Sequence, residues 1–148
     1  MPPVTAIQPF NIHSFVLKIP DIDTVGFFMH CSGLELTFDV YEYQEGGNND
    51  FVHQLPVRMK YTNIKLTRPL DKDTQNVANW FATMTGPLTR TTGHITALTA
   101  ELKPMATWHL NGIIPVRWQG PSFNAESAKL ATETLELAHH GFRYEKQG

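Results

Sequence analysis

The sequence predicts a mostly β domain with a single helix, and three observations support this prediction. Apolar and polar residues alternate over most of the chain, which is typical of strands with one buried face. Only one segment has convincing helical spacing. The chain has 148 residues, a length that suits one hydrophobic core better than two. We therefore expect a single domain over residues 1–148.

The clearest strands lie in the first half of the chain. Residues 15–19 and 25–29 alternate in apolar character, and turn residues follow each run. Residues 34–41 alternate most strictly, and residues 57–61 are their expected partner strand. The apolar side of these runs is expected in the core: Phe15, Leu17, Leu34, Leu36 and Phe38.

A long polar loop at about residues 42–54 separates the last two of these strands. It is too long for a tight hairpin, and its Gly46-Gly47 pair is not followed by the Lys-Ser/Thr of a phosphate loop. Ordering such a loop has an entropic cost, so a docking surface for a neighbouring molecule is the favoured interpretation. The candidate contact residues are Glu42, Tyr43, Glu45, Gly46, Gly47, Asn48, Asn49, Asp50 and Phe51.

The helix is expected directly after the β-rich first half. Asp73 is the predicted N-cap, and Gly86-Pro87 is the predicted stop. Four residues share one face of the segment between them: Val77, Trp80, Phe81 and Met84. Two further strands are expected at 95–102 and 107–116, around a Lys103-Pro104 turn. Trp80 and Trp108 are expected in the core.

Residues 125–138 carry conflicting signals. Ala128, Ala131, Leu135 and Ala138 have helical spacing, whereas residues 132–137 alternate like a strand with one polar face. Leu135 and Leu137 are expected in the core under the strand interpretation. The residues alone leave this choice open, although propensity favours a helix.

The charge balance argues against nucleic acid and membranes as direct partners. Twelve basic and fourteen acidic residues give a net charge of −2, and 18% of residues are charged. About a quarter is usual in soluble domains, so this chain is expected to hide surface against neighbours. No apolar run approaches the length of a membrane span, and the N-terminus has no basic region. We expect synthesis in the cytoplasm without a signal peptide.

The sequence offers little for catalysis or metal binding. Of seven histidines, only His139 and His140 are adjacent, and neighbouring residues on a strand point to opposite faces. Cys31, the single cysteine, sits in an apolar run typical of strand packing. We expect no catalytic residues, no metal and no cofactor. An enzyme that uses Cys31 and a histidine remains an alternative.

Several motifs in a fixed order are more informative than any one of them. Ser32-Gly33-Leu34-Glu35, Glu45-Gly46-Gly47-Asn48 and the stretch 133–142 occur in this order, with further matches at 63–68 and 115–121. Together they closely resemble the tail-tube proteins of contractile phages and of phage-derived contractile injection particles. The resemblance covers nearly the whole chain. Pro69 and His140 depart from the family pattern, which often has Gly and Glu there.

The resemblance implies a small β-barrel or sandwich of two packed antiparallel sheets with one helix, related to the ring protein of type VI secretion. It also implies that residues 132–138 form a strand. Six copies would form a ring, and stacked rings would form a hollow conduit for protein or DNA inside a contractile sheath. Baseplate or spike and terminator components would be further partners. The assembled protein would belong to a virion tail or an injection particle that acts outside the cell.

Two polar strand faces are assigned to the lumen of this tube, where large apolar patches would make cargo stick. They comprise Glu35, Thr37 and Asp39, together with Thr132, Thr134 and Glu136. Repeated around a ring, their carboxylates would give a negative lining. Alternatively these faces meet the sheath. The alternative function is a small monomeric β-barrel that binds a ligand in an internal cavity.

Overall fold

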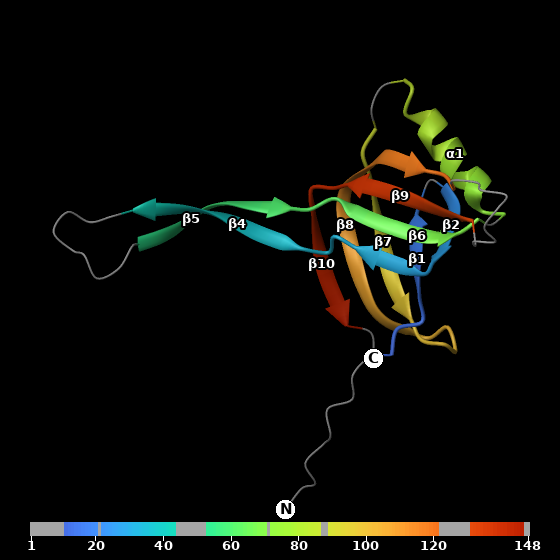
Figure 1. Ribbon diagram of the computed structural model, residues 1–148, viewed down its shortest axis with the longest axis horizontal. Coiled ribbons are helices and arrows are strands. Elements are labelled where there is room, and N and C mark those ends of the chain that lie inside the picture. Colours follow the sequence, from blue (N-terminus) through green and yellow to red (C-terminus); the bar gives the residue numbers. More distant parts are fainter. Residues whose placement is uncertain are drawn as a thin grey trace, which may run out of the picture.

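The computed structural model describes residues 11–20, 22–43, 53–70, 72–86, 89–121 and 131–146 (Figure 1). In chain order the first six strands are β1 Ser14–Ile19, β2 Ile22–Phe28, β3 His30–Ser32, β4 Leu36–Tyr43, β5 His53–Tyr61 and β6 Ile64–Pro69. The helix α1 follows at Thr74–Thr83. The remaining strands are β7 Thr91–Leu98, β8 Pro104–Gln119, β9 Thr132–Ala138 and β10 Gly141–Lys146.

Nine of these elements pack as two antiparallel layers and the helix beside them. The first layer has the strand order β2-β1-β7-β8, and β10 pairs with the other side of β8. The second layer has the order β8-β9-β6-β3. The expected sandwich of antiparallel sheets with one helix is therefore confirmed, although the two layers share one long strand.

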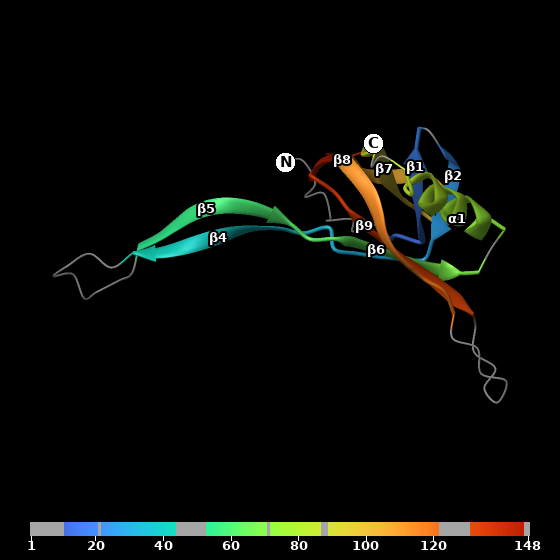
Figure 2. The same ribbon diagram turned by 90° about the horizontal axis from the view of Figure 1, so that it is seen from above.

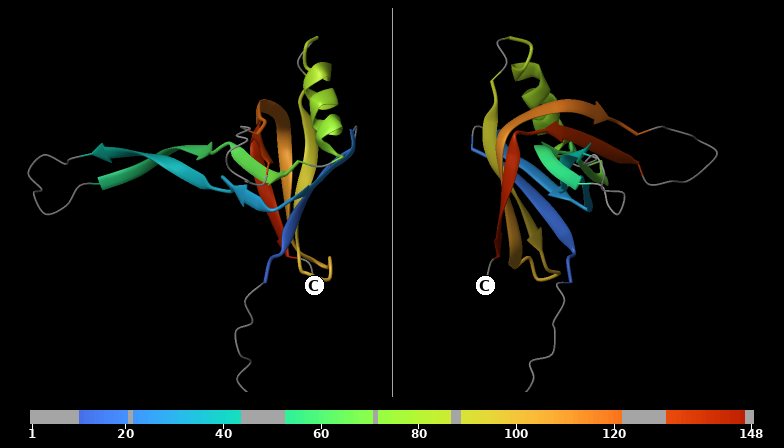
Figure 3. Two further views of the ribbon diagram at one scale, coloured as in Figure 1. Left: turned by 45° about the vertical axis from the view of Figure 1, so that its right-hand side comes forward. Right: turned by 90° about the vertical axis from the view of Figure 1, so that its left-hand side faces the viewer.

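The shared strand β8 passes from one layer to the other at Gly112. Its first half pairs with β7 and β10, and its second half pairs with β9. Gly112 has φ +62°, and a Cβ there would lie 2.5 Å from Nδ1 of His140. Only glycine fits this bend, which lets one strand belong to both layers. Figure 3 shows β8 curving over the top of the sandwich.

The hydrophobic core fills the space between the layers. Leu17 and Ile95 face it from the first layer, and Leu66 and Leu135 face it from the second. Among the residues expected in the core, four are buried: Leu17, Trp80, Leu135 and Leu137. Three are partly buried and pack against the same cluster: Phe15, Leu34 and Trp108.

Strands β4 and β5 form a two-stranded arm that leaves the sandwich (Figures 1 and 2). The expectation that Leu36 and Phe38 lie in the core was wrong, because both side chains lie on this arm and are 49% and 50% exposed. The alternation was real, but a lone ribbon has no second layer to cover its apolar side.

The helix begins at Thr74 and packs through Val77 and Trp80, which are buried. Asp73 makes no side-chain capping bond, contrary to the sequence prediction. Its carboxylate instead lies beside Gly26 of β2, where a Cβ would be 3.0 Å from Oδ2. The helix ends at Thr83, before the predicted stop at Gly86.

The ambiguous C-terminal segment is a strand at residues 132–138, as the family resemblance implied. Residues 122–130 lie outside the described part of the chain. Pairing with β6 on one side and β8 on the other provides hydrogen-bond partners for the backbone of this strand. Tertiary pairing therefore overrides the helix propensity of the alanines and leucines.

Candidate assembly surfaces

The first candidate surface is the apolar face of the β4–β5 arm. Leu36 pairs with Tyr61 and Phe38 pairs with Met59, so these four side chains lie on one face. At the base of the arm, Tyr61 packs against Phe142, with ring centroids 5.4 Å apart. Since Phe142 packs on the core, the apolar face of the arm continues the core-facing side of the second layer.

Val40, on the same side of β4 as Leu36 and Phe38, extends this face of the ribbon toward its tip. Four of the exposed large hydrophobic side chains lie on this face: Leu36, Phe38, Val40 and Met59. A contiguous apolar surface of this kind marks an interaction site in a folded protein. An isolated two-stranded ribbon is also marginally stable in water. The arm therefore has both the surface and the need for a partner.

The opposite face of the arm is polar next to the sandwich and apolar near the tip, where the exposed residues Tyr41 and Leu55 pair with each other. Thr37 pairs with Lys60, and Asp39 pairs with Arg58. The Nζ atom of Lys60 lies 2.9 Å from Oδ2 of Asp39 in an exposed ion pair. Because Leu36 and Tyr61 continue the core side, this polar face continues the outer face of the second layer.

The outer face of the second layer carries rows of polar side chains across three strands. One row is Lys65, Glu136 and Arg117, and the next includes Thr67 and Thr134. Their hydroxyl oxygens lie 3.2 Å apart, and Asn63 Nδ2 donates to Glu136 Oε1 at 3.2 Å. Thr132, at the end of β9, pairs with Pro69.

The structure thus places Thr132, Thr134 and Glu136 on one face, with Thr37 and Asp39 on the polar face that extends it. Glu35 lies in the turn before β4, where its N–H donates to the carbonyl of Gly33. The expected negative lining is not supported by the described residues. Asp39 and Glu136 share the combined face with four bases: Arg58, Lys60, Lys65 and Arg117.

Only the ends of the predicted contact loop are described. Glu42 is exposed and pairs with Gln54, and Tyr43 pairs with His53, so both belong to the end of the arm. The other predicted contact residues lie outside the described part of the chain: Glu45, Gly46, Gly47, Asn48, Asn49, Asp50 and Phe51.

Cys31 is a poor nucleophile. It packs against the core, and burial raises the pKa of its thiol to about 11, so the reactive thiolate is scarce at neutral pH. His139 is bonded to the backbone on both sides: Gly141 N–H donates to its Nδ1, and its Nε2 lies 2.9 Å from the Thr62 carbonyl. Within the described ranges, no three His, Cys, Asp or Glu side chains converge as metal ligands would.

The alternative of an internal ligand cavity also lacks support. The sheet ends in the edge strands β2 and β3 and does not close into a barrel, and the core fills the interior. A groove of about 420 Å³ lies instead on the outer face of the first layer. No helix in the described part of the chain is long and apolar enough to cross a bilayer.

A buried polar network joins the layers and the helix, and sequence reasoning missed it. Arg68 and Glu133 face each other across β6 and β9, in the register that places leucines in the core. Glu133 also accepts bonds from Trp118 Nε1 at 2.8 Å and from Thr74 Oγ1 at 3.1 Å. One signal of this network is present in the sequence: Arg68 and Glu133 each occur at a position that alternates in phase with the core residues of the same strand.

An open two-layer β sandwich with a protruding apolar arm defines a subunit built to pack against other subunits. The chain belongs to the family of the T4-like virus tail tube protein gp19, whose model matches residues 11–143. It is therefore a structural subunit of a tail tube, as the sequence motifs implied. No individually curated protein matches the chain.

Solved structures show the same fold at low sequence identity. The chain is similar to one in the anti-feeding prophage tube-terminating cap, with 20% identity, coverage of 99% of this chain and 97% of that one, and a TM-score of 0.82. A chain in the sheath–tube complex of an extracellular contractile injection system, PVC, is 20% identical, with coverage of 94% of this chain and 93% of that one and a TM-score of 0.79. Hcp1 from Salmonella typhimurium is 14% identical, with coverage of 92% of this chain and 87% of that one and a TM-score of 0.57.

Proposed function

We propose that six copies of this chain close into a ring and that rings stack into a hollow tube within a contractile particle. A similar chain occurs in the anti-feeding prophage baseplate, which was determined with six-fold symmetry. Head-to-tail contacts repeat indefinitely, whereas a two-fold contact closes on itself. A ring that stacks head to tail therefore gives a filament of one protein, and the subunit acts as a passive wall.

The observation that carries this proposal is the apolar face of the arm. Such an exposed apolar face is typical of an interaction site, and a two-stranded ribbon has no second layer of its own to cover it. A neighbouring copy in the same or the next ring would cover it and complete the missing second layer. The loop at the tip, residues 42–54, would then reach the neighbour as well.

The polar face formed by the second layer and the arm is proposed to line the lumen. It combines threonines with paired opposite charges, as in the row Lys65, Glu136 and Arg117. The rows on the second layer stay hydrated and offer cargo little apolar surface to hold, whereas Tyr41 and Leu55 near the tip of the arm would meet a neighbouring copy. Protein or DNA would pass along it, without recognition of a nucleotide sequence.

The remaining partners follow from the assemblies that contain similar chains. These are a PVC sheath–tube complex, a PVC sheath/tube terminator and an anti-feeding prophage baseplate. We infer that a sheath surrounds the tube, that a terminator closes one end, and that a baseplate or spike occupies the other. Sheath contraction would supply the energy, and the tube would act in a tail or particle outside the producing cell.

Two matched double variants test the role of the arm. Phe38→Ser with Met59→Ser makes the apolar face polar, whereas Asp39→Ser with Lys60→Ser removes the exposed ion pair on the opposite face. We expect the first variant to remain folded, by circular dichroism, but to form no tubes by negative-stain microscopy. The second should form normal tubes. Normal tubes from the first variant would contradict the proposed role of the arm.

A further inference from the structure

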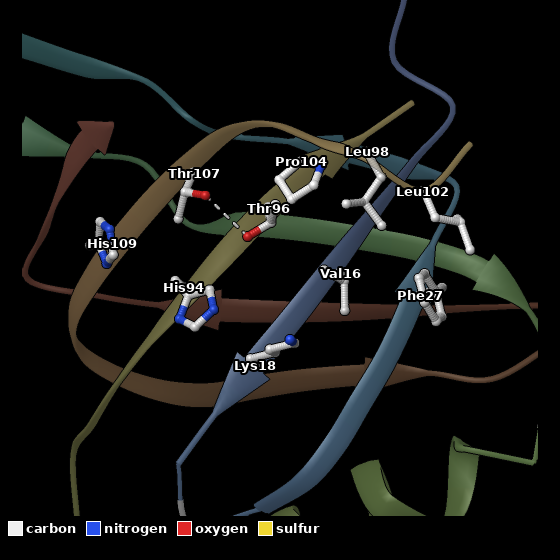
Figure 4. Close-up of a pocket in the computed structure, with 10 residues that line it drawn as sticks. All are labelled: Val16, Lys18, Phe27, His94, Thr96, Leu98, Leu102, Pro104, Thr107 and His109. Atoms are coloured by element: carbon white, nitrogen blue, oxygen red, sulfur yellow. Dashed lines mark hydrogen bonds between the residues drawn. The ribbon is translucent and has the colours of Figure 1, made fainter. Parts of the chain in front are cut away.

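The outer face of the first layer carries the groove of about 420 Å³. Figure 4 shows its two ends. Val16, Phe27, Leu98 and Leu102 make one end apolar, and two histidines and a lysine occupy the other. Thr96 and Thr107 form the floor between them, and their hydroxyl oxygens lie 3.2 Å apart. The groove therefore joins an apolar pocket to a basic edge.

The basic edge is one straight row across four strands. In the strand register, Lys18 of β1 pairs with His94 of β7, His94 pairs with His109 of β8, and His109 pairs with Arg143 of β10. Paired residues of an antiparallel sheet lie side by side on the same face. The row therefore presents two permanent cations at its ends and two imidazoles between them.

Among the residues that the structure describes, Glu145 is the carboxylate that is paired with this row. Glu145 Oε2 lies 2.8 Å from His109 Nε2, and both side chains are partly exposed. Partial burial, His109 and Lys18 together lower the pKa of His94. Lys18 and Arg143 are exposed, and in the described part of the chain neither forms an ion pair, whereas His109 is paired with Glu145. An acidic group from outside would complete the row.

The apolar end carries an independent sign of a contact. Leu102, in the turn between β7 and β8, has φ +62° and is 57% exposed. A bulky side chain is unfavourable in this left-handed conformation, where Gly or Asn is usual. Exposure of a leucine adds a second cost in water. Contact with another molecule would offset both the conformational cost and the cost of exposing Leu102 to water.

We propose that this groove is the docking site for a segment of the surrounding sheath that carries carboxylates beside apolar side chains. The inference rests on the proposed function: if the second layer lines the lumen, the first layer on the opposite side of the sandwich forms the outer wall. The carboxylates bind the row from Lys18 to Arg143. The apolar side chains cover Phe27 and Leu102.

The charges favour this occupant over the arm of another copy. The described arm balances Asp39 and Glu42 against Arg58 and Lys60, so it offers no excess of carboxylates. A basic row could also attract a nucleic acid, but only if the first layer, and not the second, faced the lumen. The experiment below distinguishes these two orientations.

Charge reversal on the two outer faces provides matched variants. Lys18→Glu with Arg143→Glu changes the first layer, and Lys65→Glu with Arg117→Glu makes the same change of charge on the second. Tubes of each variant are mixed with the sheath protein of the same particle, pelleted, and assayed for bound sheath. We expect the first pair to weaken attachment by about tenfold or more, and the second to leave it unchanged.

Each other outcome overturns part of the account. Unchanged attachment for both pairs would remove the docking site, and loss only for Lys65 and Arg117 would show that the layers are reversed. Loss of tubes in the first pair would make this face a contact between copies. Absence of tubes from the wild-type chain would overturn the proposed function itself.

A neutral variant protects the test against misfolding. Leu102→Asn suits the left-handed conformation and removes only exposed apolar surface, so the fold should keep its stability. We expect weaker sheath attachment for Leu102→Asn and normal attachment for the apolar control Leu102→Met. Equal attachment in both would contradict a role for the apolar end. Attachment of wild-type tubes should also weaken with added salt.

Discussion

Arg68 and Glu133 form a buried ion pair across β6 and β9, in which Arg68 Nε donates to Glu133 Oε1 at 2.5 Å. Their side chains are 2% and 1% exposed. Arg68 Nη1 also donates to the carbonyl of Val25 at 2.6 Å, and the guanidinium lies over the ring of Phe28. Gly26 makes room for this arrangement, because a Cβ there would clash with Nη1. The pair thus connects the second layer to β2.

Breaking this pair should be strongly destabilising. Glu133→Gln keeps the shape of the side chain but leaves the Arg68 charge buried without its partner, which costs about 3–5 kcal/mol. Asp39→Asn, in the exposed pair with Lys60, should cost less than about 1 kcal/mol. Urea unfolding of both variants measures the difference. Similar losses of unfolding free energy in the two variants would show that the buried pair stabilises the fold no more than the exposed pair does.

The alternation of side chains predicted most strands because the period of two is a local property. It gave β4 and β5 as partners, and the enrichment in β-branched residues gave the strand character of β7 and β8, with ends within a few residues. It could not show where Leu36 and Phe38 would lie, because burial depends on whether a second layer covers the face. That information is not local, and in this chain the second layer is absent from the arm.

The candidate surfaces were predictable to different degrees. The polar parity of Thr132, Thr134 and Glu136 was visible in the sequence, but the pairing of Glu136 with Lys65 and Arg117 required the register of three strands. The row from Lys18 to Arg143 was invisible for the same reason, since its members are far apart in the chain. Motif order, not periodicity, indicated the tail-tube family.

Shortening the loop at residues 42–54 to a tight turn should leave a folded domain that no longer forms tubes. The sandwich is held by its own core, whereas the tip of the arm contacts only a neighbour on this account. Size-exclusion chromatography and electron microscopy of the shortened chain provide the measurement. If it still polymerises normally, the loop has another role.

Cys31 should be almost inert in the folded protein. With its pKa raised to about 11, only about one thousandth of the thiol is ionised at pH 8. Alkylation should therefore be slow until the chain is unfolded. Cys31→Ala should cost about 1 kcal/mol through lost packing and leave tube formation intact. Rapid alkylation of the folded chain at neutral pH would show that the thiol is activated.

Protonation of His94 should destabilise the fold. Burial, His109 and Lys18 lower the pKa of His94 from its ordinary value of 6.5, so the unfolded chain binds this proton more readily. The contribution to stability is complete above pH 6.5 and is lost as the pH falls through the lower folded pKa. His94→Gln should flatten this part of the pH–stability curve, with His13→Gln as the control. An unchanged slope would contradict the linkage.

The central claim is that the apolar face of the arm joins copies of this chain into a tube. The most direct measurement is a cryo-electron microscopy map of assemblies grown from the purified chain, with baseplate components supplied if needed. The account predicts stacked rings in which a neighbouring copy covers Phe38 and Met59, while Thr134 and Glu136 face the lumen. A chain that remains a monomer or a two-fold dimer, or tubes in which Phe38 and Met59 face solvent, would contradict it.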